Sequence, residues 1–341
     1  MPPHPFAEYV PLKLNAQNNL LVKNMNWLWQ ISSPICAHEY DGMVQSWPAK
    51  LHLLKRRLSF MAKAVPLTDA LLAYRNSAGS PLQRAIEQRP YILGVVIWPY
   101  MCWTWPVKTK LQRVAEHYKV IGRMGSIFDF PMDKAVLLLN LEEVTPGLRV
   151  IMDQPKWLMR EGLLVVNLFM ADVRIYSLAF SFALEDDQVV VHIGAVQGVD
   201  TEGILEEYKT LTKALHGMRP RDFLLEVFRT LCRCAGVAKI YAVDDAKRQQ
   251  RSSYFGAAKA NSLFMDYNDI WVERGAIRHN DEFFILSLDT PMKNLDEVAS
   301  KKRAMFRRRY ELLHSIEQQI SGVLNGLTAR NVISVPGKLD Q

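Results

Sequence analysis

The pattern of apolar and polar positions divides the chain into a helical part and a part rich in strands. From Leu21 to about Arg89, apolar residues recur at helical spacing, most clearly in LHLLKRRLSFMAKA, and the segment SAGSP interrupts them. The segments LRVIMD, GLLVVNLFM, VRIYSLAFSFAL and QVVVHIGAV follow, rich in β-branched residues and separated by short turn-like pieces. Because tight connections join antiparallel neighbours, this section predicts a meander.

A crossover after the meander predicts one parallel pair of strands. The helix that begins at Pro220 carries apolar residues at helical spacing, and Gly236 ends it. The apolar run KIYAV follows directly, and a helix that links two strands of one sheet places them parallel. We therefore expect an antiparallel meander at 163–170, 174–184 and 188–196, with 239–243 parallel to its last strand.

The C-terminal part of the pattern predicts one more strand and a long helix. The strand is EFFILSL, and the helix runs from about Asn294 to Leu324, with Asn294 and Glu297 placed as in a capping box. The fold class is α/β (α+β), a mixed sheet with an antiparallel meander. The expected organisation is a mainly helical region at 1–105, a mixed α/β domain at 106–325 and a C-terminal tail at 326–341.

The order of these elements resembles that of the core of GCN5-related acyltransferases. Those enzymes hold the pyrophosphate of coenzyme A with an Arg/Gln-x-x-Gly-x-Gly/Ala loop after the fourth strand. The corresponding segment here reads QGVDTEG, which does not match that loop. The resemblance therefore implies an acyltransferase-like core, and it leaves the acyl donor open between coenzyme A, an acyl carrier protein and none at all.

The basic composition is compatible with an anionic partner without choosing one, and basic proteins that have no such partner are common. The 341-residue chain has a formal net charge of +7 at pH 7, which suits a phosphate-bearing molecule, an acyl carrier protein or a lipid headgroup. Nucleic acid is the least favoured partner, because the basic residues lack interleaved aromatics and no known nucleic-acid module is visible. The eight scattered histidines and four cysteines predict no metal site and no disulfide framework.

The sequence predicts a cytoplasmic protein that contacts the inner membrane only peripherally, if at all. The N-terminus lacks a basic segment followed by an apolar core, so no secretory signal is visible. The longest apolar run, 91–105, is shorter than the roughly 20 residues that a membrane span requires. Nucleotide-binding, zinc-protease and serine-hydrolase motifs are absent as well.

Six short segments resemble the VirK/YbjX family of bacterial proteins. They are EHY (116–118), REG (160–162), IGAVQG (193–198), TKALHGMRP (212–220), DYNDIW (266–271) and KKRAMFRRRY (301–310), in family order over roughly residues 90–322. That family is a domain of unknown function linked to virulence, envelope integrity and tolerance of cationic antimicrobial peptides. The resemblance implies an envelope-supporting or virulence factor, and it supplies no catalytic residue.

Two of these segments suggest where a ligand could bind. His192 alternates with Val190 and Gly194 on one face of its strand and could lie over a pocket, although a histidine that is hydrogen-bonded within the sheet is the more common case. Gln197 and Gly198 end that strand, where a residue without a side chain allows either a close ligand or a turn. Thr212, Lys213, His216 and Arg219 gather donors just before a helix N-terminus, which suits an anion.

The C-terminal helix carries two cations in an unexpected place. Projected at about 100° per residue, Lys302 and Arg309 fall within the apolar face of the predicted helix. A buried charge must reach solvent, pair with an acid or meet an anionic ligand. Both residues are therefore candidate ligand contacts.

These observations support two hypotheses of different kinds. In the first, the protein transfers acyl or related groups in support of the envelope, with His192 as general base and Lys213 and Arg219 holding the anion. In the second, it is a non-enzymatic adaptor whose basic helix binds anionic lipid or a protein partner. The sequence names no substrate and leaves open whether the protein is an enzyme.

Overall fold

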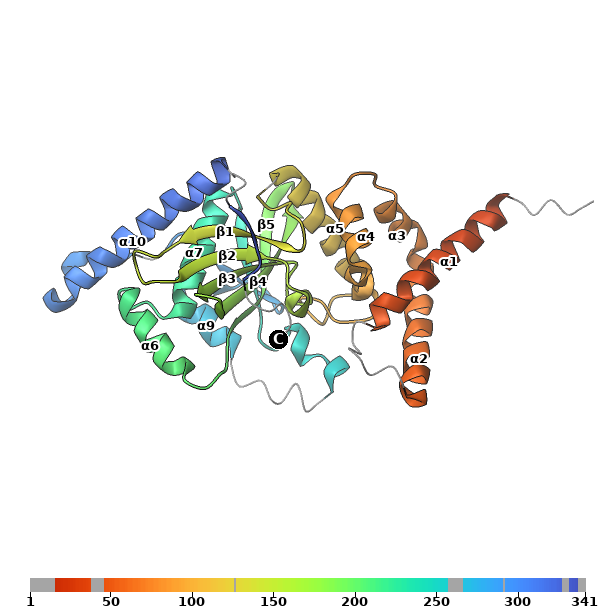
Figure 1. Ribbon diagram of the computed structural model, residues 1–341, viewed down its shortest axis with the longest axis horizontal. Helices are drawn as coiled ribbons and strands as arrows, with labels where there is room; N and C mark the ends of the chain where they lie inside the picture. The colour runs from red at the N-terminus through yellow and green to blue at the C-terminus, as the bar shows by residue number, and fades with distance from the viewer. Residues whose placement is uncertain are drawn as a thin grey trace, which may run out of the picture. The chain divides into compact units, whose positions relative to one another are not determined.

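The computed structural model describes residues 16–37, 46–125, 127–256, 266–290, 292–326 and 331–336 (Figure 1). The chain divides into two compact units, Met1–Asn76 and Ser77–Gln341. Each is described by itself below. No helix in these described ranges combines the length and the apolar composition that crossing a membrane requires.

The first unit is helical, as the spacing of its apolar residues predicts. It contains α1 (Ala16–Ala37), α2 (Trp47–Ala64) and α3 (Thr68–Arg75). Ser46 begins α2 by accepting a hydrogen bond from the main-chain N–H of Ala49. Arg57 of α2 donates to the hydroxyl of Ser32 and to the carbonyl of Trp29, both at 2.9 Å, and joins α2 to α1.

The second unit is built on a mixed sheet. Its described strands form a nine-stranded sheet in the order β7-β8-β6-β5-β4-β3-β2-β1-β9. The strands are β1 (Lys134–Asn140), β2 (Leu148–Asp153), β3 (Leu164–Met170), β4 (Val173–Glu185), β5 (Gln188–Gly198), β6 (Lys239–Val243), β7 (Ile277–Arg278), β8 (Phe283–Leu286) and β9 (Val332–Ser334). Its helices are α4 (Pro81–Gln88), α5 (Val107–Met124), α6 (Ile204–Ala214), α7 (Pro220–Cys234), α9 (Tyr267–Glu273) and α10 (Ser300–Asn325).

The predicted strand pairing is confirmed. β3, β4 and β5 are antiparallel neighbours, and β6 lies parallel to β5 with His192 opposite Tyr241. Asp186 and Asp187 have φ of 49° and 62°, the left-handed pair that a two-residue hairpin turn requires. The crossover helix α7 packs on the sheet, where the rings of Phe228 and Phe180 lie 4.8 Å apart.

Three parts of the fold differ from the expectation. The long C-terminal helix begins at Ser300, because Asn294 caps only a short 3-10 turn, Leu295–Glu297. β1 was not predicted, and β9 pairs with it from within the segment expected to be a tail. Residues 337–341 of that tail lie outside the described residues. The boundaries proposed at 105 and 325 stay a prediction.

The described fold is thus a mixed α/β unit with a mostly antiparallel sheet and a long C-terminal helix. In Figure 1 α6 lies on the same side of the sheet as one end of α10. α10 packs against α7. These three helices enclose the site described next.

Candidate functional site

The turn between α6 and α7 has a well-defined backbone geometry. The N–H of Gly217 donates to the carbonyl of Thr212 at 2.7 Å, and the N–H of His216 donates to that of Lys213 at 3.2 Å. This pair of bonds is the Schellman arrangement that ends many helices, in which the residue after the cap is left-handed. Here that residue is His216, with φ of 52°, and Gly217 follows with φ of 81°.

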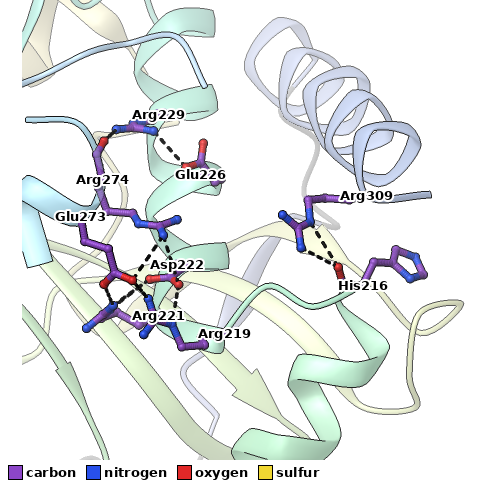
Figure 2. A network of polar contacts seen from close by, with 9 residues as sticks. All are labelled: His216, Arg219, Arg221, Asp222, Glu226, Arg229, Glu273, Arg274 and Arg309. Carbon is purple, nitrogen blue, oxygen red and sulfur yellow. Dashed lines mark hydrogen bonds and ion pairs between the residues drawn. The ribbon is translucent and has the colours of Figure 1, made fainter. Parts of the chain in front are cut away.

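Arg309 of α10 binds this turn (Figure 2). Its guanidinium donates two hydrogen bonds to the main-chain carbonyl of His216, at 3.2 Å from Nε and 2.8 Å from Nη2. A Cβ atom at Gly217 would lie 3.1 Å from Nη2 of Arg309 and 3.1 Å from the sulfur of Met305. The turn therefore needs glycine at 217 both for its backbone angle and for the close approach of α10.

A groove with a volume of about 880 Å³ lies between α6, the turn, the start of α7 and α10. Five Lys or Arg side chains line it against one acid, Glu206. The basic lining residues are Lys209, Lys213, Arg219, Arg221 and Arg308, and His216 joins them. The structure thus brings four predicted residues, Thr212, Lys213, His216 and Arg219, into one groove, with Arg309 bonded to its turn.

An ion network at the start of α7 fixes two of these cations. The buried carboxylate of Asp222 accepts from Arg219 at 2.7 Å and from Arg221 at 3.0 Å. Glu273 of α9 also accepts from both arginines, and Arg274 lies 3.6 Å from Asp222 (Figure 2). Three guanidinium groups meet two carboxylates, so one positive charge remains uncompensated within this cluster.

The other cations that line the groove have fewer acidic partners. Lys209 pairs with Glu206 at 2.6 Å. Lys213 and Arg308 are exposed, and within the described residues neither forms an ion pair. Partial burial, followed by the charges of Arg308 and Arg309, lowers the pKa of His216. The charges of Arg308 and Arg309 contribute a positive potential at the His216 imidazole, and an anion bound there would offset it.

The groove also has an apolar wall. Tyr176 of β4 and Tyr208 of α6 lie with ring centres 5.4 Å apart, and Leu205 and Met305 complete the wall. Gly198 makes the tyrosine pair possible, because a Cβ there would lie 2.5 Å from the hydroxyl oxygen of Tyr208. The absence of a side chain at Gly198 thus accommodates these two rings.

A second hollow adjoins Tyr176 at the end of β5. Its volume is about 530 Å³, and Gln197 and Gly198 line it. Its apolar lining includes Trp157, Phe169 and Val173. The hollow that Gln197 and Gly198 line therefore shares Tyr176 with the groove. Both residues remain candidate ligand contacts.

His192 lies elsewhere, within the aromatic core. Its ring is 5.1 Å from Tyr241, 5.0 Å from Phe283 and 5.9 Å from Trp105, measured between ring centres. Burial, followed by the charge of Arg113, lowers its pKa to about 3. A histidine with this pKa is a weak proton acceptor, and its role as general base stays a prediction.

The predicted position of Lys302 requires a correction. The buried residues of α10 are Leu312, Leu313, Ile316 and Ile320, and the first of them lies ten residues after Lys302. Lys302 is exposed, and Arg309 is half-buried. The projection failed because it included Leu295 and Val298, which precede the helix. A ligand contact at Lys302 stays a prediction.

No sequence pattern indicates a role for Glu161, a buried acid on the REG segment. One of its oxygens accepts from the side-chain amides of Gln249 at 2.7 Å and Gln250 at 2.5 Å. Among the residues that the structure describes, its other oxygen has no hydrogen-bond partner. Burial raises the pKa of Glu161 to about 7, against the lowering effects of Gln249 and Arg160. The sequence signal that could have indicated Glu161 is its place in the REG segment, which resembles the VirK/YbjX family.

The described residues contain no group of three or more His, Cys, Asp or Glu side chains placed to hold a metal ion. The groove can instead bind an anion through lysine and arginine donors, which form strong charge-assisted hydrogen bonds to phosphate oxygens. Its tyrosine wall can cover an apolar group at the same time.

Comparison with known proteins identifies relatives without a known role. A family described as "Protein of unknown function (DUF535)" matches residues 49–322. An uncharacterized protein of Haemophilus influenzae is 33% identical over 153 residues, which cover 43% of this chain and 47% of that protein. The uncharacterized protein YbjX of Escherichia coli is 32% identical over 134 residues, covering 39% of this chain and 40% of YbjX. The matches thus span about half the length of these relatives, and no solved structure matches the chain.

Proposed function

The chain belongs to the DUF535 family of proteins of unknown function, and from its groove we propose that it binds a phosphate-bearing molecule with an apolar chain. The observation that carries the proposal is the convergence of Lys213 and Arg308 beside the Tyr176–Tyr208 pair. Cations and an apolar wall in one groove match the two halves of such a molecule.

The charge of the groove supports an anionic headgroup. Asp222 and Glu273 hold Arg219 and Arg221 in fixed positions, so these two guanidinium groups are oriented before a ligand arrives. Lys213 and Arg308 complete the cationic lining without acidic partners in the described part of the chain. Preorganised donors lose little conformational entropy on binding, which favours affinity for phosphate.

The second hollow supports an apolar chain. It adjoins the groove at Tyr176 and is lined by Trp157, Phe169 and Val173. A chain that passes the tyrosine pair would exchange water for apolar contacts, which contributes roughly 25 cal/mol for each Å² buried. Acyl phosphates, phospholipids and acyl-phosphopantetheine groups share this chemistry.

We further propose that the ligand is an acyl donor or a membrane lipid, handled on the cytoplasmic side of the inner membrane in support of the envelope. The order of elements that resembles acyltransferases supports the donor, either coenzyme A or the prosthetic group of an acyl carrier protein. The adaptor alternative retains the same molecule without reacting it. The two versions differ in whether a product forms.

Native mass spectrometry of the purified protein tests the proposal. We expect a retained adduct whose mass corresponds to a phosphate-bearing amphiphile, and its loss in the double variant Lys213→Gln/Arg308→Gln. A lipid adduct would favour the lipid source, whereas an acyl-coenzyme A or carrier-protein adduct would favour the donor. An adduct that persists unchanged in the variant would place binding outside the groove.

A further inference from the structure

The second helix of the first unit exposes an apolar stripe that the described residues of its own unit do not cover. Trp47 is 78% exposed, Leu51 45%, Leu54 43% and Leu58 55%. These residues are spaced by four, three and four positions, so they lie along one line of α2. Single exposed apolar residues are ordinary on a protein surface, but an aligned set on one helix indicates an interaction surface.

The same helix buries a different face. Phe60 and Ala64 of α2 are fully buried, and Arg57 bonds to α1. At about 100° per residue, the buried face lies well away from the line that joins Trp47 and Leu58. α2 is therefore apolar on two sides, and packing against residues 16–37 and 46–76 accounts for only one of them.

The positive charge beside the stripe favours a partner that carries phosphate groups. α2 carries Lys50, Lys55, Arg56, Arg57 and Lys63 and has no acidic residue. Lys50 and Lys55 are exposed and project about 70° to either side of the stripe. Lysines at the border of an apolar stripe extend their charged ends toward phosphate groups while the stem stays on apolar surface.

We propose that α2 is a membrane-surface helix that lies on an anionic lipid bilayer. Trp47, Leu51, Leu54 and Leu58 enter the boundary between headgroups and acyl chains, and Lys50 and Lys55 bind anionic headgroups. Tryptophan favours that boundary, and Trp47 stands at the start of the helix. This inference does not depend on the groove or its ligand.

Cosedimentation of the full-length protein with vesicles tests the proposal. Vesicles of phosphatidylethanolamine with phosphatidylglycerol should bind the protein, and vesicles of phosphatidylcholine alone should bind it less. The double variant Leu54→Gln/Leu58→Gln should partition at least about tenfold more weakly, because two leucines no longer enter the bilayer. Lys50→Gln/Lys55→Gln should reduce the preference for anionic vesicles, and added salt should do the same.

A matched control replaces exposed apolar residues of the second unit. Val272 and Ile277 are 62% and 75% exposed, and Val272→Gln/Ile277→Gln should bind vesicles as the wild type does. Brominated lipid should quench the emission of Trp47, so the wild type should lose more fluorescence than Trp47→Phe.

Three results would overturn the proposal. The first is equal vesicle binding by the wild type and Leu54→Gln/Leu58→Gln, or no binding by either. The second is self-association of the wild type without vesicles that this variant abolishes, because the stripe would then join two copies. The third is a lower unfolding temperature for this variant and not for Val272→Gln/Ile277→Gln, because another part of the chain would then cover the stripe.

Discussion

The guanidinium of Arg309 donates two hydrogen bonds to the main-chain carbonyl of His216, and so joins the C-terminal helix to the turn at the groove. His216 has a left-handed backbone, which is uncommon outside glycine. Its carbonyl faces α10 because of that backbone, and Arg309 supplies the partner. The shape of the groove therefore depends on a contact between segments that are distant in sequence.

Loss of this contact should destabilise the fold. In Arg309→Ala the His216 carbonyl loses both donors, and we expect a cost of about 1–3 kcal/mol in the free energy of unfolding. Lys302→Ala is the matched control on the same helix, and its exposed side chain should change stability by less than about 0.5 kcal/mol. Urea unfolding measures both variants. Equal effects would show that the turn does not need Arg309.

A side chain at Gly217 should destabilise the turn. Gly217→Ala adds a Cβ 3.1 Å from Arg309 and from Met305, in a backbone with φ of 81°. We expect a loss of about 1–3 kcal/mol, the sum of backbone strain and local displacement. Gly203→Ala separates the two causes, because Gly203 has φ of 80° with no atom within 4 Å of its Cβ position. Thermal unfolding of both variants should show the larger loss at Gly217, and equal losses would exclude the steric part.

Glu161 should make stability depend on pH in a defined direction. Its pKa in the folded protein is about 7, above the ordinary value of 4.5. The folded protein therefore binds this proton more tightly than the unfolded chain, and the resulting stabilisation is lost as pH rises from 4.5 through 7. Glu161→Gln mimics the protonated acid. It should match the wild type near pH 5 and exceed its stability near pH 8 by on the order of 2–3 kcal/mol.

Three other groups, Glu185, His117 and His192, also make stability depend on pH. The pKa of Glu185 is lowered by hydrogen bonds from Lys239 and Tyr241, so Glu185→Gln should reduce stability near pH 8. The pKa values of His117 and His192 are about 3, below the ordinary 6.5, so their contribution is lost as pH falls through that range. Chemical unfolding measured from acidic pH to pH 8 separates the two trends, which are the loss of stability with rising pH caused by Glu161 and the loss with falling pH caused by the two histidines. A Glu161→Gln protein less stable than the wild type near pH 8 would contradict the raised pKa.

Local patterns predicted much of the fold. The dense β-branched runs and their short connections fixed the strands β3, β4 and β5, and the crossover through α7 fixed the parallel partner β6. β9 could not be found in this way. It is three residues long and becomes a strand only by pairing with β1, which lies far from it in the sequence.

The groove was predicted from one wall only. Thr212, Lys213 and Arg219 are close in sequence and precede a helix, so their grouping was visible. Tyr176 and Arg308 come from β4 and α10, and no local pattern indicates that they meet the α6–α7 turn. The sequence indicated Arg309 as a charge on an apolar face. In the structure its guanidinium donates to the main-chain carbonyl of His216. The start of α10 was misplaced because Asn294 satisfies the capping pattern on a shorter turn.

The central claim is that the groove binds phosphate attached to an apolar chain, and isothermal titration with dodecyl phosphate tests it most directly. Dodecyl maltoside serves as the uncharged comparison, and lysophosphatidic acid and acyl-coenzyme A distinguish the lipid from the donor. Lys213→Gln/Arg308→Gln should weaken dodecyl phosphate binding ten- to a hundredfold, about 1.4–3 kcal/mol. Lys301→Gln/Arg307→Gln removes the same charge from two exposed positions of α10 that do not line the groove, and it should change the affinity by less than about threefold. Equal losses in the two double variants, or equal affinity for dodecyl maltoside, would contradict a phosphate site in the groove.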